Sequence, residues 1–224
     1  MTIEFEKNIS AAAPGLEVLL VEAEVDSLAT SDALWAEIEA ACAMIRDKYP
    51  MDQVRLRGAI DATRAAYKAC GKEPNRYRPS AEALCRRAVK GLELYRSLAL
   101  IDLINLMSLL SGHSIGGFDT DRFAGNTLTL GVGAEDEPYD AIGRGELNIA
   151  GLPVFRDAVG GVGTPTSDNE RTKLSPSTRR ITMTINMYGQ GEYTKEEVEA
   201  LARRLLAEYA NARNVTTSYW TVKQ

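Results

Sequence analysis

The sequence predicts a mixed fold in which helices pack against β-sheet. Apolar residues recur at helical spacing over much of the first half of the chain and again near its end. Short alternating segments, separated by glycine-containing turns, occupy most of the remainder. A chain of 224 residues, 45% hydrophobic and 25% charged, is long enough to bury one substantial core. We therefore expect a single domain over residues 1–224.

The first part of the chain, residues 2–74, combines strands and amphipathic helices. It opens with strand-like alternation in TIEFEKNI and GLEVLLVEAEV. The segment SDALWAEIEAACAMIRDKY then places four apolar residues at helical spacing, Leu34, Ile38, Ala41 and Ile45. A second helix is predicted in DQVRLRGAIDATRAAYKACG, with Gly71 as a C-terminal cap. We expect both helices to pack against a sheet.

The second part, residues 75–187, begins with two more helices and continues with strands. Pro79 and Ser80 suit the start of the helix AEALCRRAVK, which ends at Gly91. The helix SLALIDLINLMSLLSG is apolar around much of its circumference, so we expect it to be buried. Strands are predicted in TLTLGVG, PYDAIG, ELNIAG, LPVFRDA and RRITMTINMY. The polar break GGVGTPTSDNERTKLSPST is long for a turn, and long loops inside domains are often functional.

The third part is a helix and a final strand. Thr194 and Glu197 form a capping box ahead of the helix EEVEALARRLLAEYANAR. The segment NVTTSYWTV alternates as a strand does.

Charge and composition restrict the classes of function. The net charge is −5 and the isoelectric point is about 5.1, so the chain lacks the general basic excess of a protein that grips nucleic acid. Two local clusters remain as candidate RNA contacts, although each is equally typical of a solvated surface: Arg76, Arg78, Arg86, Arg87 and Lys90, and Arg171, Lys173, Arg179 and Arg180.

The location and the cofactor content are also restricted. The sequence contains no long apolar run and no signal-peptide pattern at MTIEFEKNIS, so we expect a cytoplasmic protein without membrane contact. Cys42, Cys70 and Cys85 are odd in number and widely spaced, which predicts reduced thiols. The chain has a single histidine and no recognisable metal-ligand spacing, so we expect neither a metal nor another cofactor.

Two segments carry residues suited to chemistry. His113, the only histidine, follows the apolar helix, where it can act as a general base or simply cap the helix C-terminus. Gly112, Gly116 and Gly117 predict a backbone-rich loop beside it. Downstream, TPTSDNERT concentrates hydroxyl, amide and charged groups, which favour either a polar ligand site or a self-bonded turn.

Several of these motifs together resemble the editing and tRNA-binding domain of the phenylalanyl-tRNA synthetase beta subunit. IDLINL followed by GHSIGGFD resembles that family's helix and glycine–histidine motif, with Asn105 at the family asparagine and Phe118–Asp119 at the closing pair. GELNIAGLPVFRDAVGGVG resembles its acid–glycine turn and glycine-rich pocket wall. NRYRPS, GFD and TSDNERT in combination also resemble free-standing bacterial relatives. The resemblance covers about residues 70–190, flanked by a strand–helix extension and a helix–strand extension.

The resemblance implies an α+β fold with central β-sheets flanked by helices. It also implies a pocket that in the synthetase admits tyrosine wrongly attached to phenylalanine tRNA, whose ester a positioned water hydrolyses. One position departs from the family, because its editing histidine falls on Gly116, whereas His113 stands where the family has glutamine. The other synthetase modules are not recognisable, so we do not expect a complete aminoacyl-tRNA synthetase.

Three functions stay open at this stage. They are hydrolysis of misacylated aminoacyl-tRNA in trans, binding of an amino acid or aminoacyl ester without hydrolysis, and RNA or partner binding without pocket chemistry. We favour the first, with aminoacyl-tRNA or an amino acid as the partner and a weak RNA contact of the protein itself. The oligomeric state and the preferred amino acid are not readable from the sequence. The roles suggested are catalytic for His113 and Asp168 and substrate-binding for Arg76, Arg78, Asn105, Gly116, Gly117, Thr166, Ser167 and Arg171.

Overall fold

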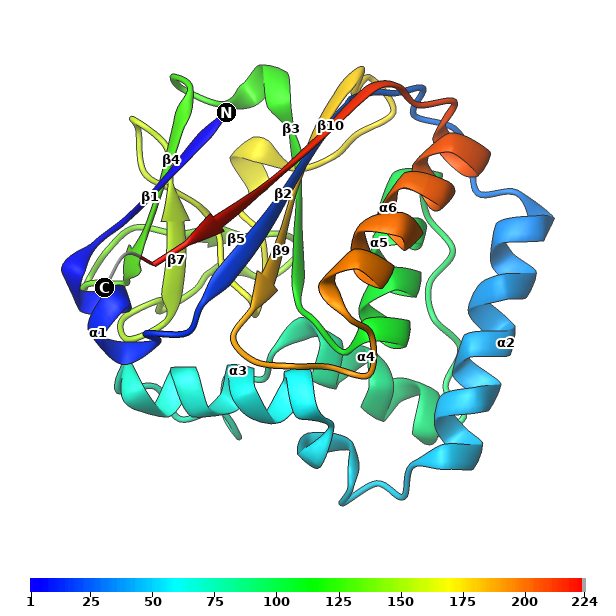
Figure 1. The fold of residues 1–224 in the computed structure, drawn as a ribbon, viewed down its shortest axis with the longest axis horizontal. Helices are drawn as coiled ribbons and strands as arrows, with labels where there is room; N and C mark the ends of the chain where they lie inside the picture. Colours follow the sequence, from blue (N-terminus) through cyan, green and yellow to red (C-terminus); the bar gives the residue numbers. More distant parts are fainter. Residues whose placement is uncertain (223–224) are drawn as a thin grey trace.

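Two four-stranded β-sheets form the centre of the protein, with helices on the far side of one of them (Figure 1). The computed structural model describes residues 1–222. The architecture is α+β, as the resemblance implies, because strands and helices segregate into layers instead of alternating regularly along the chain.

The helix-side sheet has the order β10-β2-β9-β3, and all its neighbouring strands are antiparallel. The interior strand β2 is apolar over residues 18–21, because both of its faces are buried there: Leu19 and Val21 belong to the core under the helices, and Val18 and Leu20 to the core between the sheets. The strands are β2 (Glu17–Glu24), β3 (Ile115–Asp119), β9 (Arg180–Met187) and β10 (Arg213–Thr221).

The outer sheet has the order β1-β4-β7-β8, with a parallel pair at β1–β4 and antiparallel pairs elsewhere. It packs against the helix-side sheet through a core that includes Leu128, Leu130 and Phe155 from this sheet and Phe118 from β3. A small hairpin, β5–β6, lies apart from both sheets. The strands are β1 (Thr2–Phe5), β4 (Thr127–Val132), β5 (Asp140–Ala141), β6 (Gly145–Glu146), β7 (Pro153–Arg156) and β8 (Gly161–Gly163).

Helices α5 and α6 pack against the helix-side sheet, α2 and α4 pack against α5 as an outer layer, and α3 runs beneath the sheets in the view of Figure 1. The prediction that the segment of α2 packs against a sheet is therefore wrong, because α5 lies between them. The residues predicted to face a core on α2 are all buried, and α5 is buried around most of its circumference. The helices are α1 (Lys7–Ala12), α2 (Asp32–Lys48), α3 (Gly58–Ala69), α4 (Ser80–Val89), α5 (Ala99–Ser111) and α6 (Lys195–Ala210), with short 3-10 turns at η1 (Val54–Leu56), η2 (Thr120–Arg122) and η3 (Glu170–Thr172).

The predicted glycine loop after α5 is wrong, because this segment is the buried strand β3. A Cβ atom on Gly116 would lie 2.6 Å from Cζ of Phe118, and one on Gly117 would lie 2.3 Å from Cδ1 of Ile104. The two glycines therefore serve close packing on both faces of a strand. Three further segments differ from the prediction. Helix α1 begins within TIEFEKNI, for which the sequence predicts a strand throughout. The polar break contains the strand β8, and the strand predicted in ELNIAG is reduced to the short β6.

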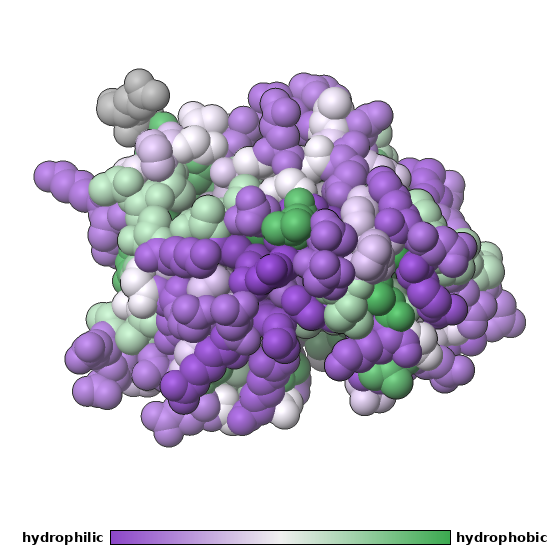
Figure 2. All heavy atoms as spheres, turned by 90° about the horizontal axis from the view of Figure 1, so that it is seen from below, coloured by the Kyte–Doolittle hydropathy of each residue, from purple (hydrophilic) through white to green (hydrophobic). Residues whose placement is uncertain are grey.

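The surface adds two observations. The face seen in Figure 2 is mostly hydrophilic, and its hydrophobic residues are scattered among polar ones. None of the helices in residues 1–222 combines the length and the apolar character needed to cross a bilayer.

Candidate functional site

A pocket of about 390 Å³ opens between α5, the start of α4, β3 and the segment 164–174; we call it the Asp168 pocket. One of its walls is aliphatic and the other is polar. The aliphatic wall is formed by Leu84, Leu98, Ile101, Ile104, Ile115 and Leu174. The polar groups include Ser80, Asn105, Ser108, Ser167, Asp168 and Lys173. Such a combination of apolar surface and a few polar groups is typical of a small-molecule site.

Asp168 is the titratable group best placed for chemistry in this pocket. Its Oδ2 accepts a hydrogen bond from the backbone N–H of Gly117 at 3.0 Å. Burial raises the pKa of the Asp168 carboxyl to about 7, and the hydrogen bond from Gly117 opposes that rise. A carboxyl group with this pKa exchanges a proton readily at neutral pH, as a general base or acid must.

The segment that carries Asp168 is held by a self-bonded turn. Oγ1 of Thr164 accepts hydrogen bonds from the N–H groups of Thr166, at 3.2 Å, and Ser167, at 3.0 Å. Tyr139 donates its hydroxyl to the carbonyl of Ser167 at 2.7 Å. The two alternatives for this loop therefore coexist, because the turn bonds to itself while Ser167 and Asp168 line the pocket.

Helix α5 and strand β3 supply the opposite wall. Asn105 lines the pocket, and its amide makes no hydrogen bond within the part of the chain that the structure describes. Gly117 of β3 also lines the pocket, and Ile104 packs so closely against it that a side chain would not fit. The structure thus brings together four of the residues selected from the sequence: Asn105, Gly117, Ser167 and Asp168.

The other selected binding residues do not line this pocket. At Gly116 the side chains of Phe118 and Thr184 fill the space that a Cβ atom would occupy, on the opposite face of β3. The hydroxyl of Thr166 forms a hydrogen bond with the hydroxyl of Tyr67 at 2.9 Å. Arg171 forms a two-pronged ion pair with Asp157 at 2.8 and 2.9 Å.

The two arginines of the NRYRP motif lie ahead of α4. Both are exposed. The guanidinium of Arg76 lies 5.6 Å from the centre of the Tyr77 ring, and Nε of Arg78 is 4.0 Å from Glu82. Neither belongs to the pocket wall, but the helix that they precede begins with Ser80, which does.

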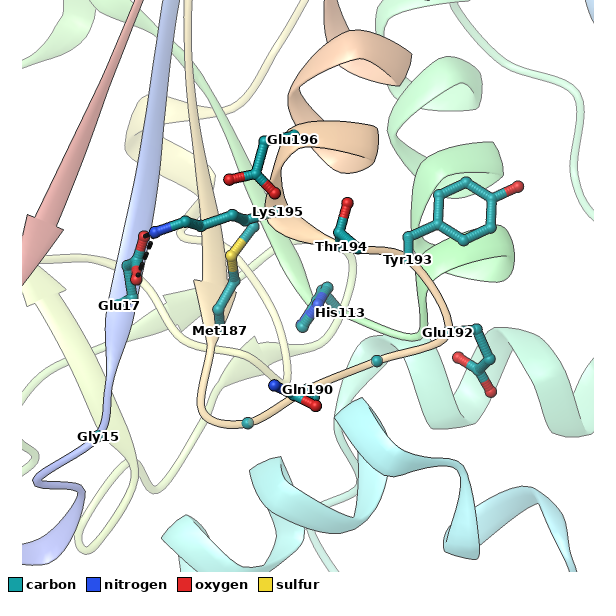
Figure 3. A pocket seen from close by; sticks show the side chains of 12 residues that line it. Gly15, Glu17, His113, Met187, Gln190, Glu192, Tyr193, Thr194, Lys195 and Glu196 are labelled. Atoms are coloured by element: carbon teal, nitrogen blue, oxygen red, sulfur yellow. Dashed lines mark hydrogen bonds and ion pairs between the residues drawn. The ribbon is translucent and has the colours of Figure 1, made fainter.

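His113 lines a different pocket, which lies at the N-terminal end of α6 and which we call the α6 pocket (Figure 3). The side chain is buried, and burial lowers its pKa to about 4. The imidazole is therefore neutral at physiological pH. His113 and Asp168 do not share a site, since the two pockets have no lining residue in common.

Sequence reasoning missed several residues of the Asp168 pocket, among them Ile101 and Ser108. With Asn105 between them, these residues follow one another at intervals of four and three along α5, which places all three on one helix face. The available signal was that Asn105 and Ser108, two of the four polar residues of this largely apolar helix, share that face. The sequence predicts Lys173 only as a member of a basic cluster, although its side chain lines the pocket and pairs with Glu170.

Comparisons with known proteins give a match to one family model and matches to solved structures. The family model described as the B3/4 domain matches residues 62–216, a range that includes both pockets' central side chains. Among the solved structures, the chain is similar to an N-terminal fragment of the phenylalanyl-tRNA synthetase beta subunit from Pyrococcus horikoshii, with 12% identity and a TM-score of 0.46. That match covers 97% of this chain and 53% of the fragment, so the chain spans about half its length. No curated protein matches the sequence.

Proposed function

Because this chain belongs to the B3/4 domain family, which is of the phenylalanyl-tRNA synthetase beta-subunit type, we propose that it hydrolyses misacylated aminoacyl-tRNA in the Asp168 pocket. The observation that carries the proposal is the Asp168 carboxyl, whose pKa burial raises to about 7, set opposite an aliphatic wall. The substrate class follows from the family. The reaction is ester hydrolysis in trans on a tRNA charged elsewhere.

The shape of the pocket supports an aminoacyl group as the substrate. Its volume of about 390 Å³ accommodates an amino acid with the terminal ribose outside. The side chain of the amino acid would lie against Ile101, Ile104 and Leu174, where burial of apolar surface stabilises it. Ser167 and Lys173 would contact the polar end of the aminoacyl group.

The chemistry needs a base and a polarised carbonyl. In its ionised form, Asp168 removes a proton from a water molecule as that water attacks the ester carbonyl. The amide of Asn105, which has no partner within residues 1–222, donates to the carbonyl oxygen that gains negative charge. The protonated Asp168 then returns its proton to the departing ribose oxygen, which releases the free amino acid and an uncharged tRNA.

The remaining selected residues take secondary roles in this proposal. Arg76 and Arg78, exposed ahead of α4, contact the tRNA end. Gly116 and Thr166 shape the walls behind the pocket through their contacts with Phe118 and Tyr67. Arg171 is left out as a ligand, because Asp157 already occupies its guanidinium.

A second function, binding of the aminoacyl group without hydrolysis, is favoured by one observation. Gly116 stands where the family has its editing histidine, and His113 faces the α6 pocket instead of the Asp168 pocket. A protein of this kind would hold the aminoacyl ester without turning it over.

Deacylation of a panel of misacylated tRNAs by the purified protein distinguishes the two functions. We expect release of the amino acid from at least one member of the panel, and a loss of about 100-fold or more in rate for Asp168→Asn. Asp47→Asn, an exposed carboxylate on α2, serves as the matched control and should retain full activity. Binding of an aminoacyl-tRNA without turnover would select the second function, and neither binding nor turnover would reject both.

A further inference from the structure

The α6 pocket is a second, partly open pocket, with a volume of about 520 Å³, that the proposed hydrolysis does not use. It lies between the start of β2, the end of β9 and the N-terminal turn of α6 (Figure 3). Its loop, residues 189–192, is packed tightly. A Cβ atom on Gly191 would lie 2.7 Å from the carbonyl oxygen of Ser111, and one on Gly58 would lie 2.5 Å from that of Gln190. The pocket is therefore built on close backbone contacts.

The N-terminus of α6 leaves hydrogen-bond donors at this pocket. In the capping box, Thr194 Oγ1 accepts from the Glu197 N–H at 3.2 Å, and Glu197 Oε2 accepts from the Thr194 N–H at 2.8 Å. The N–H groups of Lys195 and Glu196 have no acceptor within residues 1–222. Free N–H groups and the helix dipole favour a carboxylate at this end of the helix.

His113 provides an independent observation. Its side chain is 2% exposed and forms part of the pocket wall, and Figure 3 shows its ring among the lining residues. Its Nδ1 has no hydrogen-bond partner within the described residues. A buried polar atom without a partner costs free energy, so a ligand or a water that supplied the missing hydrogen bond would stabilise the site.

The charged groups of the pocket have both signs. Nζ of Lys195 lies 3.1 Å from Oε1 of Glu17 across the opening (Figure 3), and the exposed carboxylate of Glu196 is close in sequence to Lys195. Glu192 is already neutralised, because Arg57 pairs with it at 2.9 Å. A simple anion would meet Glu17 and Glu196, and a simple cation would meet Lys195 and the helix N-terminus. A zwitterion matches both.

We infer that the α6 pocket binds a free α-amino acid, with its carboxylate at Lys195 and the first N–H groups of α6 and its ammonium group at Glu17 and Glu196. The neutral imidazole of His113 offers a further hydrogen bond to the ligand. This site is separate from the Asp168 pocket, and its occupation does not depend on the proposed hydrolysis.

The test is binding of each of the twenty standard L-amino acids to the full chain, measured by calorimetry and by amide shifts in NMR spectra. For any amino acid that binds, the corresponding carboxylic acid without the amino group and the amine without the carboxylate are the matched probes. We expect both to bind at least tenfold more weakly than the amino acid itself, which should shift the amide signals of Lys195 and Glu196. Lys195→Met should weaken binding by about tenfold.

Two control variants complete the design. Arg203→Met removes another exposed cation from α6 and should leave the affinity unchanged. Asp168→Asn alters only the other pocket and should also leave it unchanged. Three results would overturn the inference: no binding of any amino acid in the millimolar range, equal affinity for the acid without an amino group, or loss of binding in Asp168→Asn but not in Lys195→Met. Because Lys195 is exposed, its variant is expected to fold.

Discussion

Asp168 illustrates how one residue can be stabilising in one protonation state and destabilising in the other. The backbone N–H of Gly117 is the only hydrogen-bond donor to its carboxyl group among the described residues, and the surroundings of that group include the aliphatic wall of the pocket. Desolvation therefore outweighs the hydrogen bond and raises the pKa to about 7. Above that pH the folded protein must carry a poorly solvated charge. Such an arrangement is typical of functional sites more than of structural carboxylates.

Asp168→Asn should therefore change stability in a pH-dependent way. The folded-state pKa of about 7 lies above the unfolded value, so the folded protein binds the extra proton between about pH 4 and pH 7. Its stability consequently falls as the pH rises through this window. Over the same window we expect the free energy of unfolding of the variant to rise relative to that of the wild type. Above pH 7 the rise should be on the order of 2 kcal/mol after allowance for the partial exposure of Asp168. Chemical denaturation from pH 4 to pH 8 measures this difference. A difference independent of pH would contradict the raised pKa.

At this scale the sequence identified only part of the site. Ser167 and Asp168 are indicated by the concentration of polar groups in TPTSDNERT, and Asn105 by the resemblance to the family's asparagine. Whether His113 shares their site depends on the direction in which the chain leaves α5, and no local pattern reveals that direction. The end of α5 turns through Gly112, with φ of 77°, which sends His113 to the α6 pocket. Their roles in binding and catalysis remain predictions.

At the scale of elements, local signals predicted helices well and missed the strand that matters most. The capping box at Thr194 and Glu197 and the helix-capping glycine Gly71 are set by neighbouring residues, and the structure confirms both. Strand β3 depends instead on distant pairing, since Gly116 lies opposite Thr184 and Gly117 opposite Met183 of β9. Glycine has no side chain to reveal such a strand, so the segment suggested a loop.

The close approach of α5 to β3 can be tested with a double-mutant cycle. In Gly117→Ala the new Cβ would lie 2.3 Å from Cδ1 of Ile104, so we expect a loss of about 1–3 kcal/mol from overpacking. Ile104→Ala removes the obstructing atom and costs about 2–5 kcal/mol by itself. Together they should cost at least about 1 kcal/mol less than the sum. Gly15→Ala, with no atom within 4 Å of the new Cβ, is the control and should be close to neutral. The free energies of unfolding are measured by urea denaturation. If the losses in the two single variants simply add up in the double variant, the close contact between Gly117 and Ile104 is wrong.

At the scale of the whole molecule, charge limits the form of the proposed tRNA contact. A net charge of −5 opposes a broad contact with a polyanion, so any contact must be local. Arg76 and Arg78 are exposed just before α4, whose first residue Ser80 lines the Asp168 pocket. Many of the other basic side chains are engaged with carboxylates, such as Arg171 with Asp157 and Arg180 with Asp121. This distribution supports a small footprint at the mouth of the pocket.

Removal of both arginines should therefore weaken tRNA binding and reduce its dependence on salt. Every phosphate group that a protein ceases to neutralise reduces the slope of log affinity against log salt by about 0.7–0.9, so Arg76→Ala with Arg78→Ala should reduce it by about 1.5. The matched control is Arg203→Ala with Arg213→Ala, which removes equal charge from α6 and β10, neither of which lines the Asp168 pocket. Filter binding or fluorescence anisotropy over a salt series measures both slopes. If the control pair reduces the slope as much as the first pair, the tRNA contact is not confined to the mouth of the pocket, and the local footprint is wrong.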